Sequence, residues 1–397
     1  MSKDTMNTYL IEPKAPLIIR TGRPFDDQSG ADEARFPPPS TLAGALRTAF
    51  ADSKCQAYGP YLADIPVAGP LPVILDAKGE PSALLVPKPA DAHYFWGEHE
   101  GKKVKLLVRS APLALMDGEG CDLPQQDLLP IQLLDKVKGK AAAGPRWWAF
   151  DDLMAWRDPV NHSLNFERIN QNGWIPPADD IRTHVAITAK TQAAESGKLF
   201  QTAGLNFWQR AEPEQNGAAA FPAAGIGLVG CIAGDIKAGV ITLGGERRLA
   251  AIKEQNDLWP QSPANLSEAL VKAGGLCLTL LTPALFANGW RPGWLNEQLE
   301  GEPPACPGLR LKLRAAALER WQPHSGWDLA KQQPRAGRKL IPAGATYWFE
   351  ILTAGHNRLD ALWLGSFCDH AQDRRDGFGL ALPQPWSPLL NPKQATY

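Results

Sequence analysis

The stretch "RFPPPSTLAGALRTAF" (35–50) decides the fold, because it sets an extended proline segment directly against a helix. Its apolar side chains recur at the spacing of one helix face, at Leu42, Leu46, Ala49 and Phe50. Pro39 cannot continue a helix toward the N-terminus, and serine is a preferred N-cap residue. We therefore expect a helix with Ser40 as its N-cap.

The start of this helix is also a candidate binding site. The free N–H groups around Ser40 and Thr41, together with the positive end of the helix dipole, favour an anion. Gly44 costs the helix about 1 kcal/mol relative to alanine, so we expect another chain, protein or RNA, to pack closely against it. An ordinary capped helix on its own sheet is the alternative.

Short apolar runs outside this stretch predict a mixed fold. Strands are expected at 9–20, 182–200, 199–209, 225–234, 275–286, 309–321, 337–352 and 374–385, and further short helices at 147–157, 291–300 and 360–372. Each half follows the order strand, helix, two strands, helix, glycine turn and strand. This βαββαβ order predicts an α+β protein with two ferredoxin-like domains, similar to RNA-recognition motifs, over 1–256 and 257–397. The first domain carries a large irregular insertion at about 55–180.

Composition excludes several classes of protein. Lys and Arg number 41 against 42 Asp and Glu, a net charge of −1, so no global field attracts nucleic acid or an anionic membrane. The six cysteines are scattered without a C-x-x-C pair, which predicts no metal and no other cofactor. We expect reduced thiols in the cytoplasm, because the sequence has no secretory segment and no apolar run long enough to cross a membrane.

Two glycine turns, "LGGERR" (243–248) and "RRDGFG" (374–379), are candidate phosphate sites. Glycine lets bare backbone N–H groups approach a phosphate, and flanking arginines supply bidentate contacts. Ordinary glycine turns with solvated arginines are the alternative. We expect Phe378, which lies between the two glycines of the second turn, to pack into the sheet.

Aromatic and basic residues give weaker signals. Of the fourteen tryptophans, Trp147 and Trp148 in the insertion are expected on a partner surface, with core packing as the alternative. The charge runs "KKVKLLVR" (102–109) and "KQQPRAGRK" (331–339) are typical of solvated faces. The match of "GIGLVG" (225–230) to a dinucleotide fingerprint lacks the flanking strand and helix, which favours a buried strand.

Five motifs follow one another along the chain: "RTGRPF" (20–25), "PPPSTLAGALR" (37–47), "LGGERR" (243–248), "IPAGATYWFEI" (341–351) and "DGFG" (376–379). In this order the chain resembles the third subunit of the Cmr complex, the type III-B CRISPR effector, within the RAMP superfamily. The resemblance implies two ferredoxin-like domains and a non-catalytic subunit of an antiviral ribonucleoprotein. It also implies that the chain binds the 5′ repeat-derived tag of the CRISPR RNA and meets target RNA indirectly. The implied protein partners are the large polymerase-like subunit and a backbone RAMP subunit.

The motifs and the resemblance together assign a set of RNA-binding residues. These are Arg20, Arg23, Ser40, Thr41, Arg47, His184, Lys190, Gly244, Gly245, Arg247, Arg248, Arg374, Arg375, Gly377 and Gly379. Some RAMP proteins cleave guide precursors by general acid–base chemistry, and His184 with Lys190 would serve that alternative. A pure protein scaffold is the second alternative.

Overall fold

The structure is a computed structural model that describes residues 6–19, 34–116, 118–125, 127–158, 164–210, 222–328, 333–355 and 359–388. The chain forms two compact units, each assembled from three stretches of sequence. The first unit comprises Met1–Ala83, Pro176–Trp259 and Pro323–Lys339, and the second comprises Leu84–Ile175, Pro260–Gln322 and Leu340–Tyr397. Residues 84–175, most of the expected insertion, therefore belong to the same unit as most of the C-terminal half.

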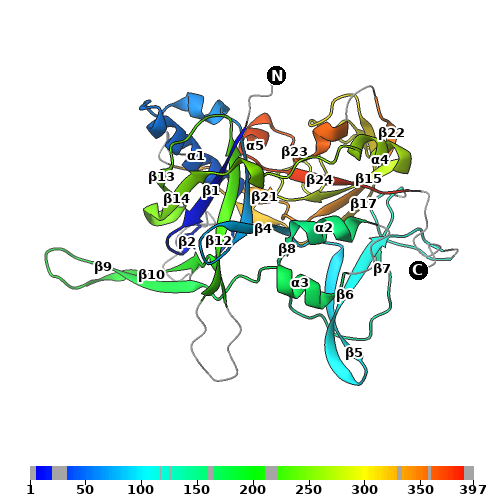
Figure 1. The fold of residues 1–397 in the computed structure, drawn as a ribbon, viewed down its shortest axis with the longest axis horizontal. Helices are drawn as coiled ribbons and strands as arrows, with labels where there is room; N and C mark the ends of the chain where they lie inside the picture. The colour runs from blue at the N-terminus through cyan, green and yellow to red at the C-terminus, as the bar shows by residue number, and fades with distance from the viewer. Residues whose placement is uncertain are drawn as a thin grey trace. The chain divides into compact units, whose positions relative to one another are not determined.

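The first unit is built on an antiparallel sheet (Figure 1). Its elements are β1 (Asn7–Pro13), β2 (Leu17–Ile18), α1 (Pro39–Ser53), η1 (Pro60–Asp64), β3 (Val67–Leu75), β9 (Asp180–Ile187), β10 (Ala194–Leu205), β11 (Trp208–Arg210), β12 (Pro222–Ile232), β13 (Gly239–Thr242), η2 (Gly245–Arg247), β14 (Leu249–Glu254), η3 (Asn256–Leu258), β19 (Trp327–Asp328) and β20 (Gln333–Pro334). Within this unit the sheet has the order β13-β14-β1-β12-β3, and β11 also pairs with β12. If β1, β3, β12 and β14 are numbered 1 to 4 along the chain, their order across the sheet is 4-1-3-2.

Helix α1 supplies much of the core of this unit. Leu42 and Leu46 are fully buried and share one hydrophobic cluster with Ile11 of β1 and Leu228 of β12. The helical periodicity of 35–50 is thereby confirmed, because the apolar face that it predicts is the face that packs on the sheet.

The start of α1 differs from the expectation. The helix begins at Pro39 with Pro38 in the N-cap position, so the prediction that Ser40 is the N-cap is wrong. Proline suits the first helical position, since the N–H that it lacks would have no partner within the helix. The proline run therefore enters the helix instead of stopping before it.

The second unit is built on another antiparallel sheet. Its elements are β5 (Ala92–His99), β6 (Lys102–Pro112), β7 (Ile131–Leu133), β8 (Trp147–Ala149), α2 (Phe150–Arg157), α3 (Phe166–Asn172), α4 (Leu266–Ala273), β15 (Gly275–Leu280), β16 (Glu300–Gly301), β17 (Arg310–Ala317), β22 (Thr346–Thr353), η4 (Leu359–Leu362), β23 (Gly365–Ser366), α5 (Ala371–Arg375) and β24 (Leu380–Pro385). The sheet has the order β16-β17-β22-β15-β24-β23. Counted by chain order, β15, β17, β22 and β24 again lie in the spatial order 4-1-3-2.

Three further strands lie where the chain passes from one unit to the other: β4 (Pro81–Pro87), β18 (Gln322–His324) and β21 (Arg338–Leu340). The antiparallel sheets and short helices confirm an α+β fold. The strand assignment of "GIGLVG" is confirmed as well, because these residues lie within the buried strand β12. Across the described ranges, no helix has the length and apolarity that crossing a membrane requires.

Two of the expected helices are wrong. Residues 291–300 form turns, in which the Asn296 side chain accepts the Glu300 N–H at 2.9 Å. Such a local side-chain bond competes with helix formation. Only the short helix η4 and the first residues of α5 fall in 360–372, because the chain turns at Leu364, whose φ is +52°.

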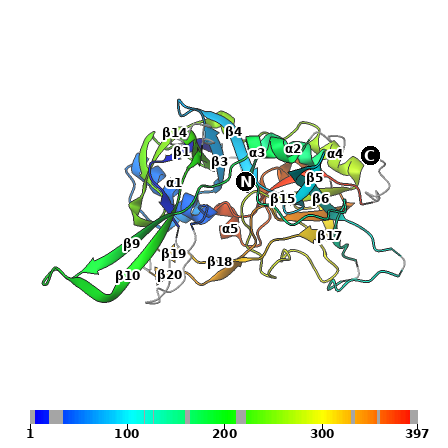
Figure 2. The ribbon, with the colours of Figure 1, turned by 90° about the horizontal axis from the view of Figure 1, so that it is seen from below.

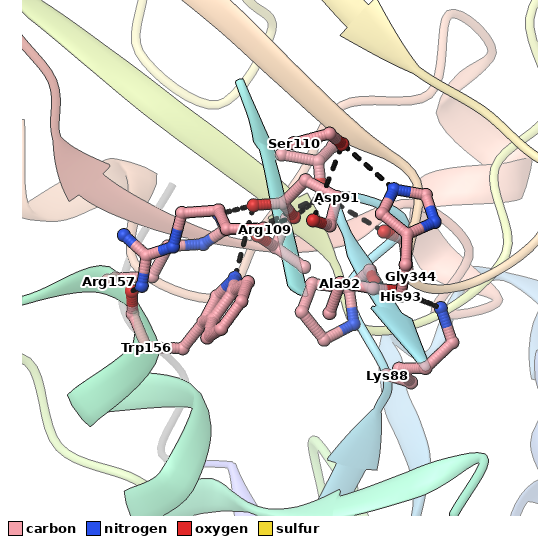
Figure 3. A network of polar contacts seen from close by, with 12 residues as sticks. Lys88, Asp91, Ala92, His93, Arg109, Ser110, Trp156, Arg157 and Gly344 are labelled. Atoms are coloured by element: carbon pink, nitrogen blue, oxygen red, sulfur yellow. Dashed lines mark hydrogen bonds and ion pairs between the residues drawn. The ribbon is translucent and has the colours of Figure 1, made fainter. Parts of the chain in front are cut away.

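A buried ion pair attaches the 84–175 segment to the sheet of the second unit (Figure 3). Two bonds of 2.6 and 2.8 Å join the carboxylate of Asp91 to the guanidinium of Arg157. Arg157 also donates to the hydroxyls of Thr279 and Thr346, at 2.8 and 3.1 Å. These two threonines lie opposite each other on the neighbouring strands β15 and β22. The pair therefore fixes the end of α2 on the two central strands.

The protonation of this pair follows from its surroundings. Burial alone would raise the pKa of Asp91, but the charge and hydrogen bonds of Arg157, with the indole N–H of Trp156, hold that pKa below its ordinary value. The folded unit therefore keeps the carboxylate ionised.

We expect Arg157→Met to lower the free energy of unfolding by about 3–5 kcal/mol, because it leaves the Asp91 carboxylate buried without its counter-ion. Adding Asp91→Asn removes that charge and should recover part of the loss. Denaturant titration of the full chain measures both. Arg310→Met is the matched control, since it breaks an exposed pair with Glu300 and should cost about 0–1 kcal/mol.

The same pair predicts a dependence on pH. Because the folded pKa of Asp91 is lowered, its contribution to stability is complete above the unfolded value of about 3.9 and is lost as the pH falls through the folded value. The wild type should therefore lose stability below about pH 4 more steeply than the double variant. Equal acid sensitivity in the two proteins would contradict this role.

Candidate nucleic-acid interface

Strand β2 joins parts of the first unit that lie far apart in the sequence. It pairs with the end of β10, where Ile18 lies opposite Gly204. The first glycine turn approaches the other side of Ile18, so that a Cβ on Gly244 or Gly245 would lie 3.1 or 3.0 Å from the Ile18 carbonyl oxygen. The β9–β10 hairpin and the turn 243–248 therefore meet at one short strand.

The glycines of this first turn serve the fold of the chain itself. Gly244 has a φ of +77°, and the space that its missing side chain leaves is filled by the backbone of β2. Arg248 is partly buried and pairs with Glu246 at 3.1 Å, whereas Arg247 is exposed. Arg247 is thus the arginine of this turn that is open to an RNA phosphate.

The β9–β10 hairpin extends away from the sheet of the first unit (Figures 1 and 2). On one of its faces His184 stacks on Phe200 with ring centroids 5.0 Å apart, and its Nε2 lies 2.9 Å from the hydroxyl of Thr202. Lys190 is exposed in the turn at the hairpin tip. Four aliphatic side chains are exposed at alternating positions of the opposite face: Ile181, Val185, Ile187 and Leu199.

The segment before α1 reaches the base of this hairpin. The N–H of Ala34 donates to the Asp179 carboxylate at 2.9 Å, and the rings of Phe36 and Phe207 lie 6.4 Å apart. The structure therefore brings the start of α1, the first glycine turn and the hairpin together in the first unit. Arg20 and Arg23 lie outside the described residues.

Helix α1 itself offers less to an anion than expected. Pro39 has no N–H, and the N–H of Thr41 donates to the Pro38 carbonyl at 2.9 Å. Ser40 and Thr41 are half-buried. Arg47 is buried, and its guanidinium donates twice to the Ile65 carbonyl, at 3.0 and 2.8 Å. Arg47 therefore holds the chain between η1 and β3, which corrects its assignment to RNA.

The second glycine turn is part of the core of the second unit. Gly377 and Gly379 are buried with φ of +88° and +71°, and the Gly377 carbonyl accepts the hydroxyl of Thr282 at 2.8 Å. Phe378 is 2% exposed, which confirms that it packs into the sheet. In this conformation the turn is closed to a phosphate, because the chain itself occupies the space around it.

The arginines beside this turn are also engaged within the chain. Arg374 donates to the carbonyl groups of Cys368 and Asp369, at 2.8 and 2.6 Å. Arg375 is half-buried. Neither side chain is presented as an open phosphate contact of the kind expected from the sequence.

The prediction that Trp147 and Trp148 form a partner surface is wrong. Trp148 is fully buried, donates to the Tyr94 hydroxyl at 2.6 Å and meets Trp156 edge-on at 5.5 Å. Trp147 is 9% exposed and packs against Trp174. The alternative of core packing holds for both rings.

One residue of the candidate site, Phe200, was not predicted from the sequence. Phe200 forms the stacked pair with His184, and the sequence signal that could have found it is the strand alternation of 194–205 opposite 180–187.

Within the part of the chain that the structure describes, no three His, Cys, Asp or Glu side chains are grouped so that they could hold a metal ion.

Comparison with known proteins identifies the family. The two sheets, each of which contains four antiparallel strands in the order 4-1-3-2, define the class as an α+β protein with a repeated antiparallel architecture. A family model described as "CRISPR-associated protein (Cas_Cmr3)" matches residues 9–386. The chain therefore belongs to the Cmr3 family of CRISPR-associated proteins.

Solved structures give weaker matches. Two cryo-EM structures of the type III-B Cmr-beta complex, one bound to cognate target RNA and AMPPnP and one bound to cognate target RNA, each contain a chain with a TM-score of 0.44 to this one. The identities are 15% and 16%, and the alignments cover 86% of both chains in each case. No curated protein gives a match to this sequence.

We expect Gly44→Ala to stabilise the protein by up to about 1 kcal/mol, because Gly44 is helical and a Cβ there would meet no atom of the chain within 4 Å. Gly244→Ala is the control with the opposite sign, since its positive φ and the nearby carbonyl strain any side chain. Denaturant titration compares the two variants. A destabilising Gly44→Ala would show that this position has a constraint within the folded chain.

Proposed function

We propose that this chain is a non-catalytic subunit of a type III-B CRISPR ribonucleoprotein that binds the 5′ repeat-derived tag of the CRISPR RNA in antiviral defence. In the same proposal it docks the large polymerase-like subunit and a backbone RAMP subunit, and it meets target RNA only through the complex. Membership of the Cmr3 family supports this assignment.

In this proposal each unit is a ferredoxin-like domain. The strand order 4-1-3-2 with antiparallel neighbours is the order that a βαββαβ chain produces, and both sheets contain four strands in this order. In the first unit α1 stands in the place of the first crossover helix. The second unit has irregular turns at that place, between β15 and β16.

The observation that carries the RNA proposal is the grouping around β2. Arg247 supplies an exposed cation for a phosphate, and the stacked His184–Phe200 pair gives a platform for an unpaired base. Single-stranded RNA is read by this combination of stacking and charge. The aliphatic face of the same hairpin suits a protein subunit, because several exposed apolar side chains on one face favour protein contacts.

A non-catalytic role agrees with the surroundings of His184. Its Nε2 is already within hydrogen-bond distance of Thr202, and its ring is held by Phe200. Both contacts suit a positioned ring more than a proton-transfer group. The six free cysteines are consistent with the reducing cytoplasm as the place of action.

The test uses the purified full chain with labelled CRISPR RNA, an unprocessed precursor and a guide with a scrambled tag. Tag-dependent binding without cleavage is the expected result. Cleavage of the precursor that is lost in His184→Ala would favour the endoribonuclease. Equal binding of the natural and scrambled tags would favour a scaffold.

Arg247→Ala is expected to weaken binding of the tagged RNA. Each lost phosphate contact lowers the slope of log affinity against log salt by about 0.7 for a single strand, and fluorescence anisotropy over a series of salt concentrations measures that slope. Arg320→Ala removes an exposed arginine elsewhere in the chain and should leave the slope unchanged. If both variants keep the wild-type slope, the first glycine turn is not part of the RNA site.

A further inference from the structure

A second site lies in the 84–175 segment, which belongs to the second unit, whereas the grouping around β2 belongs to the first. The β5–β6 hairpin (Figure 1) and the loop 135–139 enclose an open cavity of about 800 Å³. This volume is in the range of sites that hold small ligands. The end of this loop is fixed alongside β5, because the backbone N–H of Trp96 donates to the Lys140 carbonyl at 2.8 Å. One wall of the cavity is therefore the paired strands of the hairpin, and the other is a loop that a backbone hydrogen bond joins to β5.

The cavity has a local excess of positive charge in a chain whose net charge is −1. Three exposed lysines line it, Lys103, Lys136 and Lys138, together with the carboxylates of Glu98 and Asp135. Over 96–105 and 135–140 the sequence has six lysines and three acidic residues. Among the described residues, the three lining lysines have no carboxylate within 4.0 Å. Their charges are thus available to an anionic ligand.

An aromatic ring lies among these charges. Trp96 lines the cavity, and the ammonium of Lys103 lies 4.4 Å from the centre of its ring. Lys105 is 5.3 Å from the same ring and donates to the Ala143 carbonyl at 2.8 Å, so its position is fixed within the segment. A phosphate that pairs with Lys103 would draw this ammonium away from the ring and leave the indole for a base.

We propose that this cavity is a second RNA site, which binds a short single-stranded segment with its phosphates on the lysines and a base on Trp96. A cationic groove that contains an aromatic ring is the general arrangement for sequence-independent binding of single strands. An acidic polypeptide would use the lysines but has no need of the indole. The site goes beyond the proposed function, because it needs no tag and no residue around β2.

The first experiment replaces the three lysines. We expect Lys103→Gln with Lys136→Gln and Lys138→Gln to lower the salt slope for binding labelled homouridine RNA to the full chain by up to about 2, because about 0.7 is lost for each phosphate contact. The matched control is Lys78→Gln with Lys237→Gln and Lys272→Gln, which removes the same charge from exposed lysines outside the cavity. An equal fall in both proteins would mean that only net charge matters, which overturns the site.

The second experiment isolates the indole. Trp96→Ala should weaken homouridine binding by about five-fold to more than a hundred-fold, the range for loss of one stacked base, while the salt slope stays as in the wild type. Trp96→Phe keeps an aromatic face and should retain most of the affinity. If Trp96→Phe binds as poorly as Trp96→Ala while both melt like the wild type, the base is not stacked there and the proposal is wrong.

The outcomes separate this site from the proposed function. If the lysine variant loses homouridine binding but keeps its preference for tagged RNA, both proposals stand. If it binds homouridine like the wild type while Arg247→Ala loses the tagged RNA, the cavity is not an RNA site and the proposed function stands. Binding of a labelled polyglutamate peptide that is lost in the lysine variant, without any binding of homouridine, would identify an acidic polypeptide as the ligand and would overturn the RNA site.

Discussion

The ion pair between Asp91 and Arg157 is the interaction on which the second unit depends. The guanidinium of Arg157 is almost entirely buried. Its two terminal nitrogens donate to one carboxylate and to the hydroxyls of Thr279 and Thr346, whereas its Nε has no hydrogen-bond partner among the described residues. These four residues come from the 84–175 segment and from the two central strands of the sheet. The requirement to neutralise one charge therefore fixes how a long irregular segment lies on a regular sheet.

The same pair supports the cavity at the other end of the β5–β6 hairpin. Asp91 immediately precedes β5, and the first cross-strand pair of the hairpin joins Ala92 to Arg109. Arg109 in turn stacks on Trp156, 4.0 Å from the ring centre, and donates to the carbonyl of that residue. The base of the hairpin is thus held in place, and the same two strands carry Trp96 and Lys103 near its tip. A charged core and a charged surface site are therefore connected through one pair of strands.

The sequence predicted those elements whose apolar residues repeat at a regular spacing. It did not predict contacts that depend on single residues from distant parts of the chain. The spacing of Leu42 and Leu46 predicted α1 and its buried face, and Phe378 was predicted as a core residue. Nothing in the local sequence could show that Asp91 meets Arg157 or that Arg47 is buried, because such contacts depend on tertiary packing. Among the candidate site residues, Arg247 was predicted from the first glycine turn and His184 from the family resemblance, and both stay predictions as RNA contacts, whereas Phe200 needed the strand register.

The interleaving of the two units along the chain has a consequence for biosynthesis. The chain passes between units at Ala83, Ile175, Trp259, Gln322 and Lys339, so neither unit is encoded by one continuous stretch. On the ribosome the strand β15 emerges long after Arg157, and that arginine has no hydroxyl partners until 122 further residues have been made. The 84–175 segment is therefore made before the strands of the sheet on which it packs. A protein arranged in this way gains from assembling beside partners or chaperones that shield the waiting surfaces during translation.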